Sequence, residues 1–267
     1  MRLSISNIAW PNDNTAEMLK FIKDHGCDSV EIAPSRIWAE PVKSSKKQRN
    51  DLLNLVKDNG LTICSLHSLL FSRPDLGIFK DDATVEETID YFKELISLAK
   101  DLKIKVMIYG SPKSRNKGDL PHKEALAKAA KVFTKVAEYA EEAQVFFLIE
   151  PLSRSFTDFI NTTAEAMQLV NLVNKPFFQL HLDSFALSEE KDYAGVLKEY
   201  LPYAKHFHVN NPDIGEVGPK AHYHEIMSKI LKEKKYNGVI SIEMRTLPNF
   251  QQAVEKSLKY VKQTYID

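Results

Sequence analysis

The sequence predicts an α/β protein in which eight parallel strands close into a (β/α)8 barrel. Short apolar runs alternate with longer segments whose apolar residues recur at helical spacing, and eight such strand–helix units fit into the 267 residues. Eight units in a chain of roughly 250 residues are typical of this barrel. An open doubly wound sheet is the alternative. It calls for a glycine-rich turn after an early strand, which this sequence lacks. We expect a single domain over residues 1–267.

The clearest strand is Val145–Glu150, in which five apolar residues lead into a carboxylate and a proline follows. A short apolar run of this kind is typical of a strand that is buried on both faces in a parallel sheet. Similar short runs predict the remaining strands at Leu3–Ile8, Ser29–Ala33, Leu61–Leu66, Ile104–Tyr109, Phe177–Leu182, Lys205–Val209 and Val239–Ile242.

Helices are expected between these strands, where capping residues precede amphipathic segments. Asn14 or Thr15 caps the first helix, and Gly26 and Gly60 end the first two. The expected helices run from about residue 15 to His25 and over Ser45–Asn59, Thr84–Leu102, Leu120–Ala143, Thr162–Val173, Glu189–Tyr200, Tyr223–Lys235 and Pro248–Tyr265.

Charge and composition exclude several classes of partner. The formal net charge is +0 and the isoelectric point is about 7.1, so neither nucleic acid nor an anionic membrane is an expected ligand. The start of the chain lacks the pattern of a signal peptide, and no apolar stretch is long enough to span a bilayer. Cys27 and Cys64 have no metal-type spacing, which favours free thiols in a reducing compartment. We therefore expect a cytoplasmic protein.

The strand ends carry the residues with the clearest chemical potential. In a parallel barrel these ends share one rim, and ligands bind there. Three carboxylates and an imidazole that converge on this rim without strand-borne bases need a cation. The ligand types suit one divalent ion, Mn²⁺ before Mg²⁺, Co²⁺ or Zn²⁺. The proposed metal ligands are Glu150, Asp183, His208 and Glu243, and the earlier strands add Glu31 and His67 as expected substrate contacts.

His206 and His208 share one face of their strand, because alternate residues of a strand point the same way. We choose His208 as the ligand since it lies nearer the rim. His206 would lie one layer deeper, as a hydrogen-bonded histidine that supports the site.

Basic residues follow several strand ends, and arginine forks suit phosphate and carboxylate groups. As a set they favour an anionic substrate, a sugar phosphate or sugar acid. For any one of them, a solvated charge paired with a glutamate of the rim is the alternative. The expected substrate-binding bases are Lys113, Arg115, Arg154 and Arg245.

The ordered motifs resemble the sugar phosphate isomerase/epimerase family, which has the xylose isomerase-like TIM barrel fold. The likeness covers nearly the whole chain and rests on Glu31, His67, Gly110-Ser111-Pro112, Glu150-Pro151-Leu152, Asp183, His206-Phe207-His208 and Ser241-Ile242-Glu243. The resemblance implies that Glu150, Asp183, His208 and Glu243 hold the metal, and that Glu150 and Glu243 exchange protons with a small carbohydrate. It also implies a homo-oligomer.

The expected reaction is the isomerisation or epimerisation of a sugar or sugar phosphate through an enediolate. One glutamate removes the proton beside a carbonyl and the other returns one. A metal-dependent dehydratase of the inosose type is the alternative, because the same intermediate can expel a hydroxyl group. A non-catalytic ligand-binding barrel is a third hypothesis, although binding alone needs no proton acceptors on opposed strands.

The sequence departs from two branches of this family. Phe156, Ala186 and Ile214 stand where ketohexose epimerases carry an acidic residue, a histidine and a substrate-clamping arginine. The free-ketohexose pocket is therefore largely missing. The three-zinc endonucleases that share the barrel need further ligands, but this chain has the Gly110-Ser111 region, Ala186 and Lys220 there. A nuclease is not expected.

Overall fold

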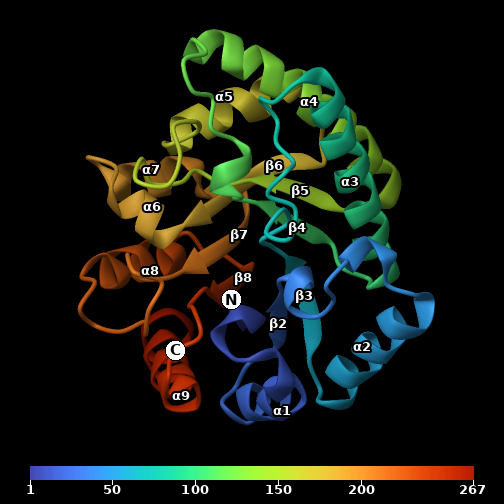
Figure 1. The fold of residues 1–267 in the computed structure, drawn as a ribbon. Helices are drawn as coiled ribbons and strands as arrows, with labels where there is room; N and C mark the ends of the chain where they lie inside the picture. The colour runs from blue at the N-terminus through green and yellow to red at the C-terminus, as the bar shows by residue number, and fades with distance from the viewer.

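The computed structural model describes residues 1–267 and confirms the closed parallel barrel (Figure 1). Its strands follow one another around the barrel in chain order, and the last pairs with the first. Serines line up across this closure, because Ser4 pairs in register with both Ser29 and Ser241. The strands are β1 (Arg2–Ser6), β2 (Ser29–Ile32), β3 (Thr62–Leu66), β4 (Val106–Tyr109), β5 (Phe146–Ile149), β6 (Phe178–Asp183), β7 (Ala204–Val209) and β8 (Val239–Ile242).

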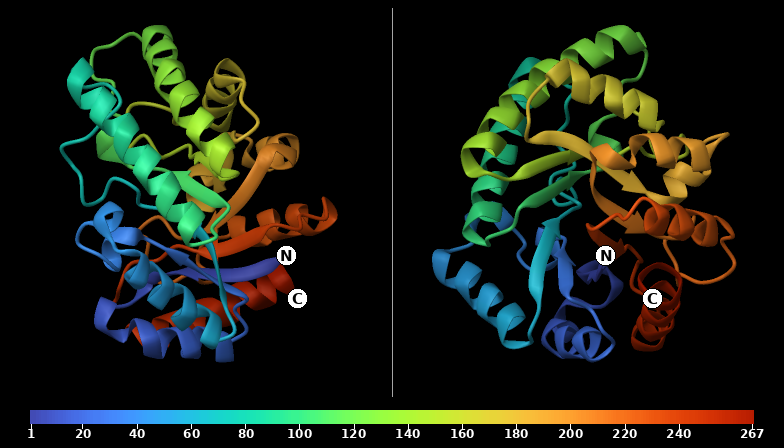
Figure 2. Two further views of the ribbon diagram at one scale, coloured as in Figure 1. Left: turned by 90° about the vertical axis from the view of Figure 1, so that its right-hand side faces the viewer. Right: turned by 180° about the vertical axis from the view of Figure 1, so that it is seen from behind.

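Helices cover the outside of the strands in all views, and the two chain ends lie close together (Figures 1 and 2). Each predicted helix is present, although one begins later than expected and a short unpredicted helix precedes it. The α-helices are α1 (Thr15–Asp24), α2 (Lys46–Asp58), α3 (Asp82–Asp101), α4 (His122–Ala143), α5 (Thr163–Val173), α6 (Ser184–Ser188), α7 (Tyr193–Tyr200), α8 (Tyr223–Glu233) and α9 (Phe250–Val261). None of these helices is both long and apolar enough to span a membrane.

A short additional helix is the clearest difference from the sequence-based prediction. A single helix was expected over Glu189–Tyr200, but a separate helix, α6, lies before that span and begins directly after β6, where the Asp183 carboxylate accepts a hydrogen bond from the Ala186 amide at 2.8 Å. The second helix, α7, starts at a separate cap, Asp192. Aspartate is a favourable N-cap residue, so Asp183 at the end of β6 starts a short helix beside the site.

The interior of the barrel is unusually polar. His208 on β7 lies 2.9 Å from Glu31 on β2, and His206 lies 3.2 Å from Ser65 on β3. Neither pair of strands is adjacent in the barrel order, so both contacts cross the interior. Most such barrels fill this space with branched apolar side chains.

The apolar core lies instead between the strands and the helices. The strand residues that alternate with the interior polar ones are fully buried there, as Leu180 and Leu182 on β6 illustrate. Aromatic side chains from helix and strand pack closely, and the ring centroids of Phe133 on α4 and Phe178 on β6 lie 5.1 Å apart. This layer therefore supplies most of the hydrophobic stabilisation.

Leu180→Ala should lower the free energy of unfolding by about 2–5 kcal/mol, because it leaves a cavity in this fully buried layer. Leu172→Ala is the matched control, since Leu172 is 56% exposed and its truncation should change stability by less than about 0.5 kcal/mol. Urea denaturation followed by circular dichroism measures both. Equal effects in the two variants would contradict the location of the core.

Candidate functional site

Four successive strands bring the predicted ligand residues together at one end of the barrel. Glu150 and Glu243 directly follow β5 and β8, Asp183 ends β6, and His208 lies near the end of β7. One ligand atom from each lies within 4.8 Å of those from the others. The three carboxylates line a cavity of about 540 Å³, and His208 is buried directly beside them. Their places at the ends of parallel strands therefore bring these four residues together.

The imidazole of His208 is held in one orientation by Glu31. Its Nε2 lies 2.9 Å and 3.1 Å from the two carboxylate oxygens of Glu31, which only accept, so Nε2 carries the hydrogen. The opposite nitrogen, Nδ1, has no hydrogen-bond partner and lies 3.7 Å from Glu150 and 3.5 Å from Glu243. Nδ1 is therefore free to act as a ligand.

Glu31 itself is fully buried and does not line the cavity. Its carboxylate also accepts hydrogen bonds from the hydroxyls of Ser65 at 2.6 Å and Ser241 at 3.3 Å. The structure therefore corrects the expected substrate contact. Glu31 lies behind His208 and contacts this imidazole and the two serine hydroxyls. His67, in contrast, does line the cavity.

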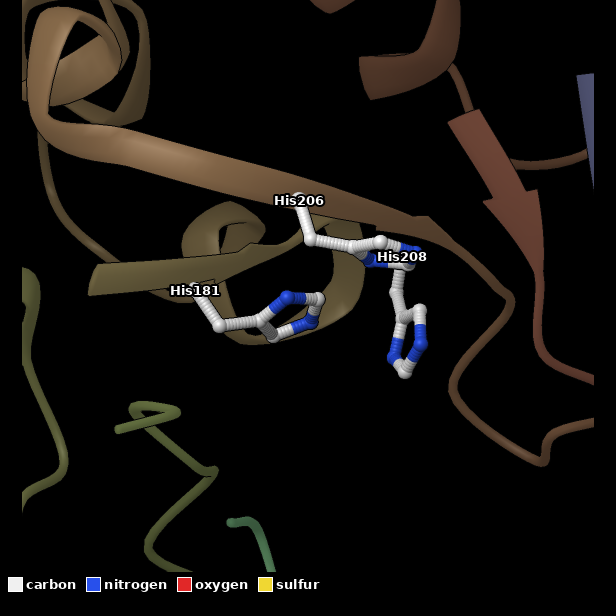
Figure 3. A group of neighbouring side chains, drawn as sticks. All are labelled: His181, His206 and His208. Carbon is white, nitrogen blue, oxygen red and sulfur yellow. The ribbon is translucent and has the colours of Figure 1, made fainter. Parts of the chain in front are cut away.

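Three neighbouring histidine side chains are buried in the interior of the barrel (Figure 3). His181 projects from β6 and His206 and His208 from β7, and the His181 and His208 ring centroids lie 4.3 Å apart. Burial lowers the pKa of His181, and it lowers that of His206 to about 3. Burial acts in the same direction on His208, but Glu31 and Glu243 outweigh it and raise the pKa of His208. The pKa of His208 therefore shifts in the opposite direction to those of His181 and His206.

The carboxylates of the cavity are too close to ionise independently. Burial, followed by the charge of Glu150, raises the pKa of Asp183 to about 8. Burial also raises the pKa of Glu150. At Glu243 the same effect of burial is outweighed by His208 and His67, which lower its pKa. A divalent cation would relieve the repulsion among these groups, so the donor set fits one.

Neighbouring polar groups position the carboxylates. The Asn210 side-chain amide donates to Asp183 at 2.6 Å and to Glu243 at 3.3 Å. The Nδ1 atom of His67 lies 3.3 Å from Glu243. Sequence reasoning missed Asn210, although its place directly after β7 was a usable signal.

Gly110 leaves room for Glu150. A Cβ atom at this position would lie 2.2 Å from a carboxylate oxygen of Glu150, far inside contact distance. A larger residue at position 110 would force the Glu150 carboxylate to shift, so glycine preserves its place beside the β4 strand end.

The structure does not bring the predicted bases together. Lys113 lines the cavity, whereas the other three do not. Arg115 is fully buried, with its guanidinium carbon 6.0 Å from the Tyr109 ring centroid and its Nε and Nη1 without partners. Arg154 lies beside Asn161 and Glu165, and Arg245 donates to the Asp213 carbonyl. The set that favoured an anionic substrate is thus reduced to one lysine.

The three positions at which the sequence departs from ketohexose epimerases all lie in the cavity wall. Phe156, Ala186 and Ile214 line it together with Phe71 and Phe185. Sequence analysis did not single out Phe71 and Phe185 as site residues. The long loop after β3 was the available signal for Phe71.

The chain is similar to several known proteins. Inosose isomerase from Halalkalibacterium halodurans is 24% identical over 268 residues, covering 96% of this chain and 92% of that protein. A probable ketose 3-epimerase from Synechocystis is 27% identical over 209 residues, covering 70% and 71%. The solved structure of the IOLI protein with a binding zinc atom is 21% identical. It superposes with a TM-score of 0.77 and covers 100% of this chain and 97% of that one.

The model of one protein family matches residues 19–264, a span that includes every residue of the cavity described above. That family is described as the xylose isomerase-like TIM barrel. The closed parallel barrel and the convergence of acidic and histidine side chains at its carboxyl end agree with this match. The chain therefore belongs to the xylose isomerase-like TIM barrel family.

Proposed function

We propose that the protein is a divalent-metal-dependent isomerase or epimerase of a small carbohydrate. The observation that carries this proposal is the position of Glu150 and Glu243. They come from β5 and β8, which are not adjacent, and their carboxylates face one small space that also contains Asp183 and the free Nδ1 of His208. The names of the two curated relatives, an isomerase and an epimerase, support the reaction class.

A metal ion is part of the proposal because of the charge balance. Glu150, Asp183 and Glu243 are buried or half-buried together, and no lysine or arginine forms an ion pair with them. Carboxylate oxygens with one imidazole suit Mn²⁺ first, then Mg²⁺, Co²⁺ or Zn²⁺. The zinc atom bound by the IOLI protein supports a divalent ion in this fold. We infer that Glu150, Asp183, His208 and Glu243 would hold it.

The two glutamates are proposed to move the proton. One carboxylate removes it from the carbon beside the substrate carbonyl, and the other returns a proton from the opposite side. A bound divalent cation would polarise that carbonyl and so make the neighbouring carbon more acidic. Asn210 and His67 contact Glu243 and would fix its direction. Return to the same carbon inverts its configuration, whereas return to the next carbon exchanges aldose and ketose.

Metal removal and return test the cofactor. Protein stripped with a chelator should regain a higher melting temperature when Mn²⁺ is added, because ion binding stabilises only the folded state. Differential scanning fluorimetry with Mn²⁺, Co²⁺, Mg²⁺ and Zn²⁺ in parallel measures the effect. If none of the four ions shifts the melting temperature, and the protein as purified contains no metal, the proposed cofactor is ruled out.

Glu150→Gln and Glu243→Gln should each lower the rate of solvent proton exchange into a ketose by about 10²–10⁴-fold, the usual contribution of a positioned acid or base. The assay is deuterium incorporation followed by mass spectrometry on a panel of ketoses and ketose phosphates. Glu233→Gln, on the exposed surface of α8, is the matched control. Loss of water from the substrate in place of proton return would favour the dehydratase alternative. Undiminished exchange in both variants would contradict the assignment.

Glu31→Gln should weaken Mn²⁺ binding by about 10- to 100-fold, because it removes the charge that fixes the orientation of His208. Titration calorimetry on chelator-stripped protein measures this, with Glu233→Gln as the control. Ser241→Ala removes one hydroxyl donor to Glu31 and should have a smaller effect. A folded Glu31→Gln protein with the affinity of the parent would show that Glu31 does not support the metal site.

A further inference from the structure

We propose that the cavity selects an uncharged keto-sugar that carries an apolar group, an aryl or alkyl substituent, at the end remote from Glu150 and Glu243. This inference rests on the proposed function, because it concerns the substrate of the same cavity. It replaces the anionic substrate that the sequence favoured.

The chemistry of the cavity changes from its floor to its wall. The floor holds the three carboxylates with His67 and Asn210, all able to bind hydroxyl and carbonyl groups. The wall contains seven hydrophobic side chains, namely Leu70, Phe71, Leu152, Phe156, Phe185, Ala186 and Ile214. The remaining wall residues are mainly serine, proline and glycine. A substrate that matches both parts has a polar reacting end and an apolar distant end.

An anionic substrate finds little to bind in this wall. Phosphate and carboxylate groups are best held by arginine forks, and no arginine lines the cavity. Lys113 is the only lysine or arginine that lines the cavity, and its side chain is exposed. The other basic side chain is that of His67, which lies on the floor. The ammonium group of Lys113 is a single, strongly hydrated charge beside an otherwise uncharged surface.

Two of the wall residues are exposed to solvent to an unusual degree. Phe71 is 77% exposed and Phe156 is 42% exposed, and they are the two phenylalanines among the exposed large hydrophobic side chains. Phe156 also packs edge-on against Phe185, with ring centroids 6.3 Å apart. Exposed aromatic surface at a concave site indicates a ligand that covers it. The substrate is the natural occupant, since these rings belong to the same cavity as Glu150 and Glu243.

The backbone holds Ile214 in this wall at a conformational cost. Its φ angle is +51°, which is rare for a β-branched residue. The conformation is kept by hydrogen bonds on both sides: the Ile214 amide donates to the Asn211 carbonyl at 2.9 Å, and the Arg245 amide donates to the Ile214 carbonyl at 2.7 Å. These two hydrogen bonds therefore fix the backbone that presents the apolar side chain of Ile214 to the cavity.

The test compares two keto-glycosides that differ only in the apolar group. Mn²⁺-loaded protein is given methyl or phenyl 3-keto-β-D-glucopyranoside in deuterium oxide, with D-fructose and D-fructose 6-phosphate in parallel, and mass spectrometry follows exchange. The phenyl compound should have a KM about 10- to 100-fold below that of the methyl compound, the scale for burying one aromatic ring. Phe71→Ser combined with Phe156→Ser should bring this ratio close to one. Leu172→Ser, another exposed apolar residue outside the cavity, should preserve it.

Other outcomes would overturn the inference. Preferred turnover of fructose 6-phosphate, equal KM values for the two glycosides, or exchange of fructose alone would each refute it while the proposed isomerase stands. A shift from oligomer to monomer in the double variant by light scattering, with the phenyl preference retained, would show that a second copy covers the phenylalanines instead. If no compound exchanges and no ion changes the melting temperature, the proposed function itself has failed.

Discussion

The hydrogen-bonded pair of Glu31 and His208 is the contact on which the site depends. A buried carboxylate is costly unless it is paired and fully hydrogen-bonded, and Glu31 meets this condition with His208, Ser65 and Ser241. The pair also joins β2 to β7 across the barrel and directs the free Nδ1 of His208 toward the carboxylates. One buried charge thereby links the two sides of the interior and orients the imidazole that we propose as a metal ligand.

The polar interior has a consequence for stability. Because serines, histidines and Glu31 occupy the space that apolar side chains usually fill, the hydrophobic stabilisation comes from the layer between strands and helices. The rings of Phe92, Phe147 and Phe178 belong to that layer, with the Phe92 and Phe147 centroids 5.1 Å apart. Each strand therefore serves two purposes. Its outward residues stabilise the fold, and its inward residues build the site.

This alternation explains what could be predicted from the sequence. The two-residue period of a strand and the shared rim of a parallel barrel are enough to predict that Glu150, Asp183 and Glu243 lie together. The contact between Glu31 and His208 spans 177 residues and crosses the barrel, so no local pattern indicates it. The loop residues were harder still. The Arg115 side chain is fully buried near the Tyr109 ring and does not line the cavity, and a sequence cannot show tertiary packing of this kind.

The floor and the wall of the cavity are built from different parts of the fold. The residues proposed for the reaction are therefore separate from those proposed for substrate selectivity. The floor residues belong to strands or follow them directly, so the barrel itself fixes their spacing. Phe71, Phe156 and Ile214 lie in loops, and the backbone of Ile214 is hydrogen-bonded to Asn211 and Arg245. Substitution in these loops can alter what the wall accepts without moving Glu150 or Glu243. We therefore expect the apolar wall to set the substrate selectivity of this chain, while Glu150 and Glu243 on the floor carry the proposed reaction.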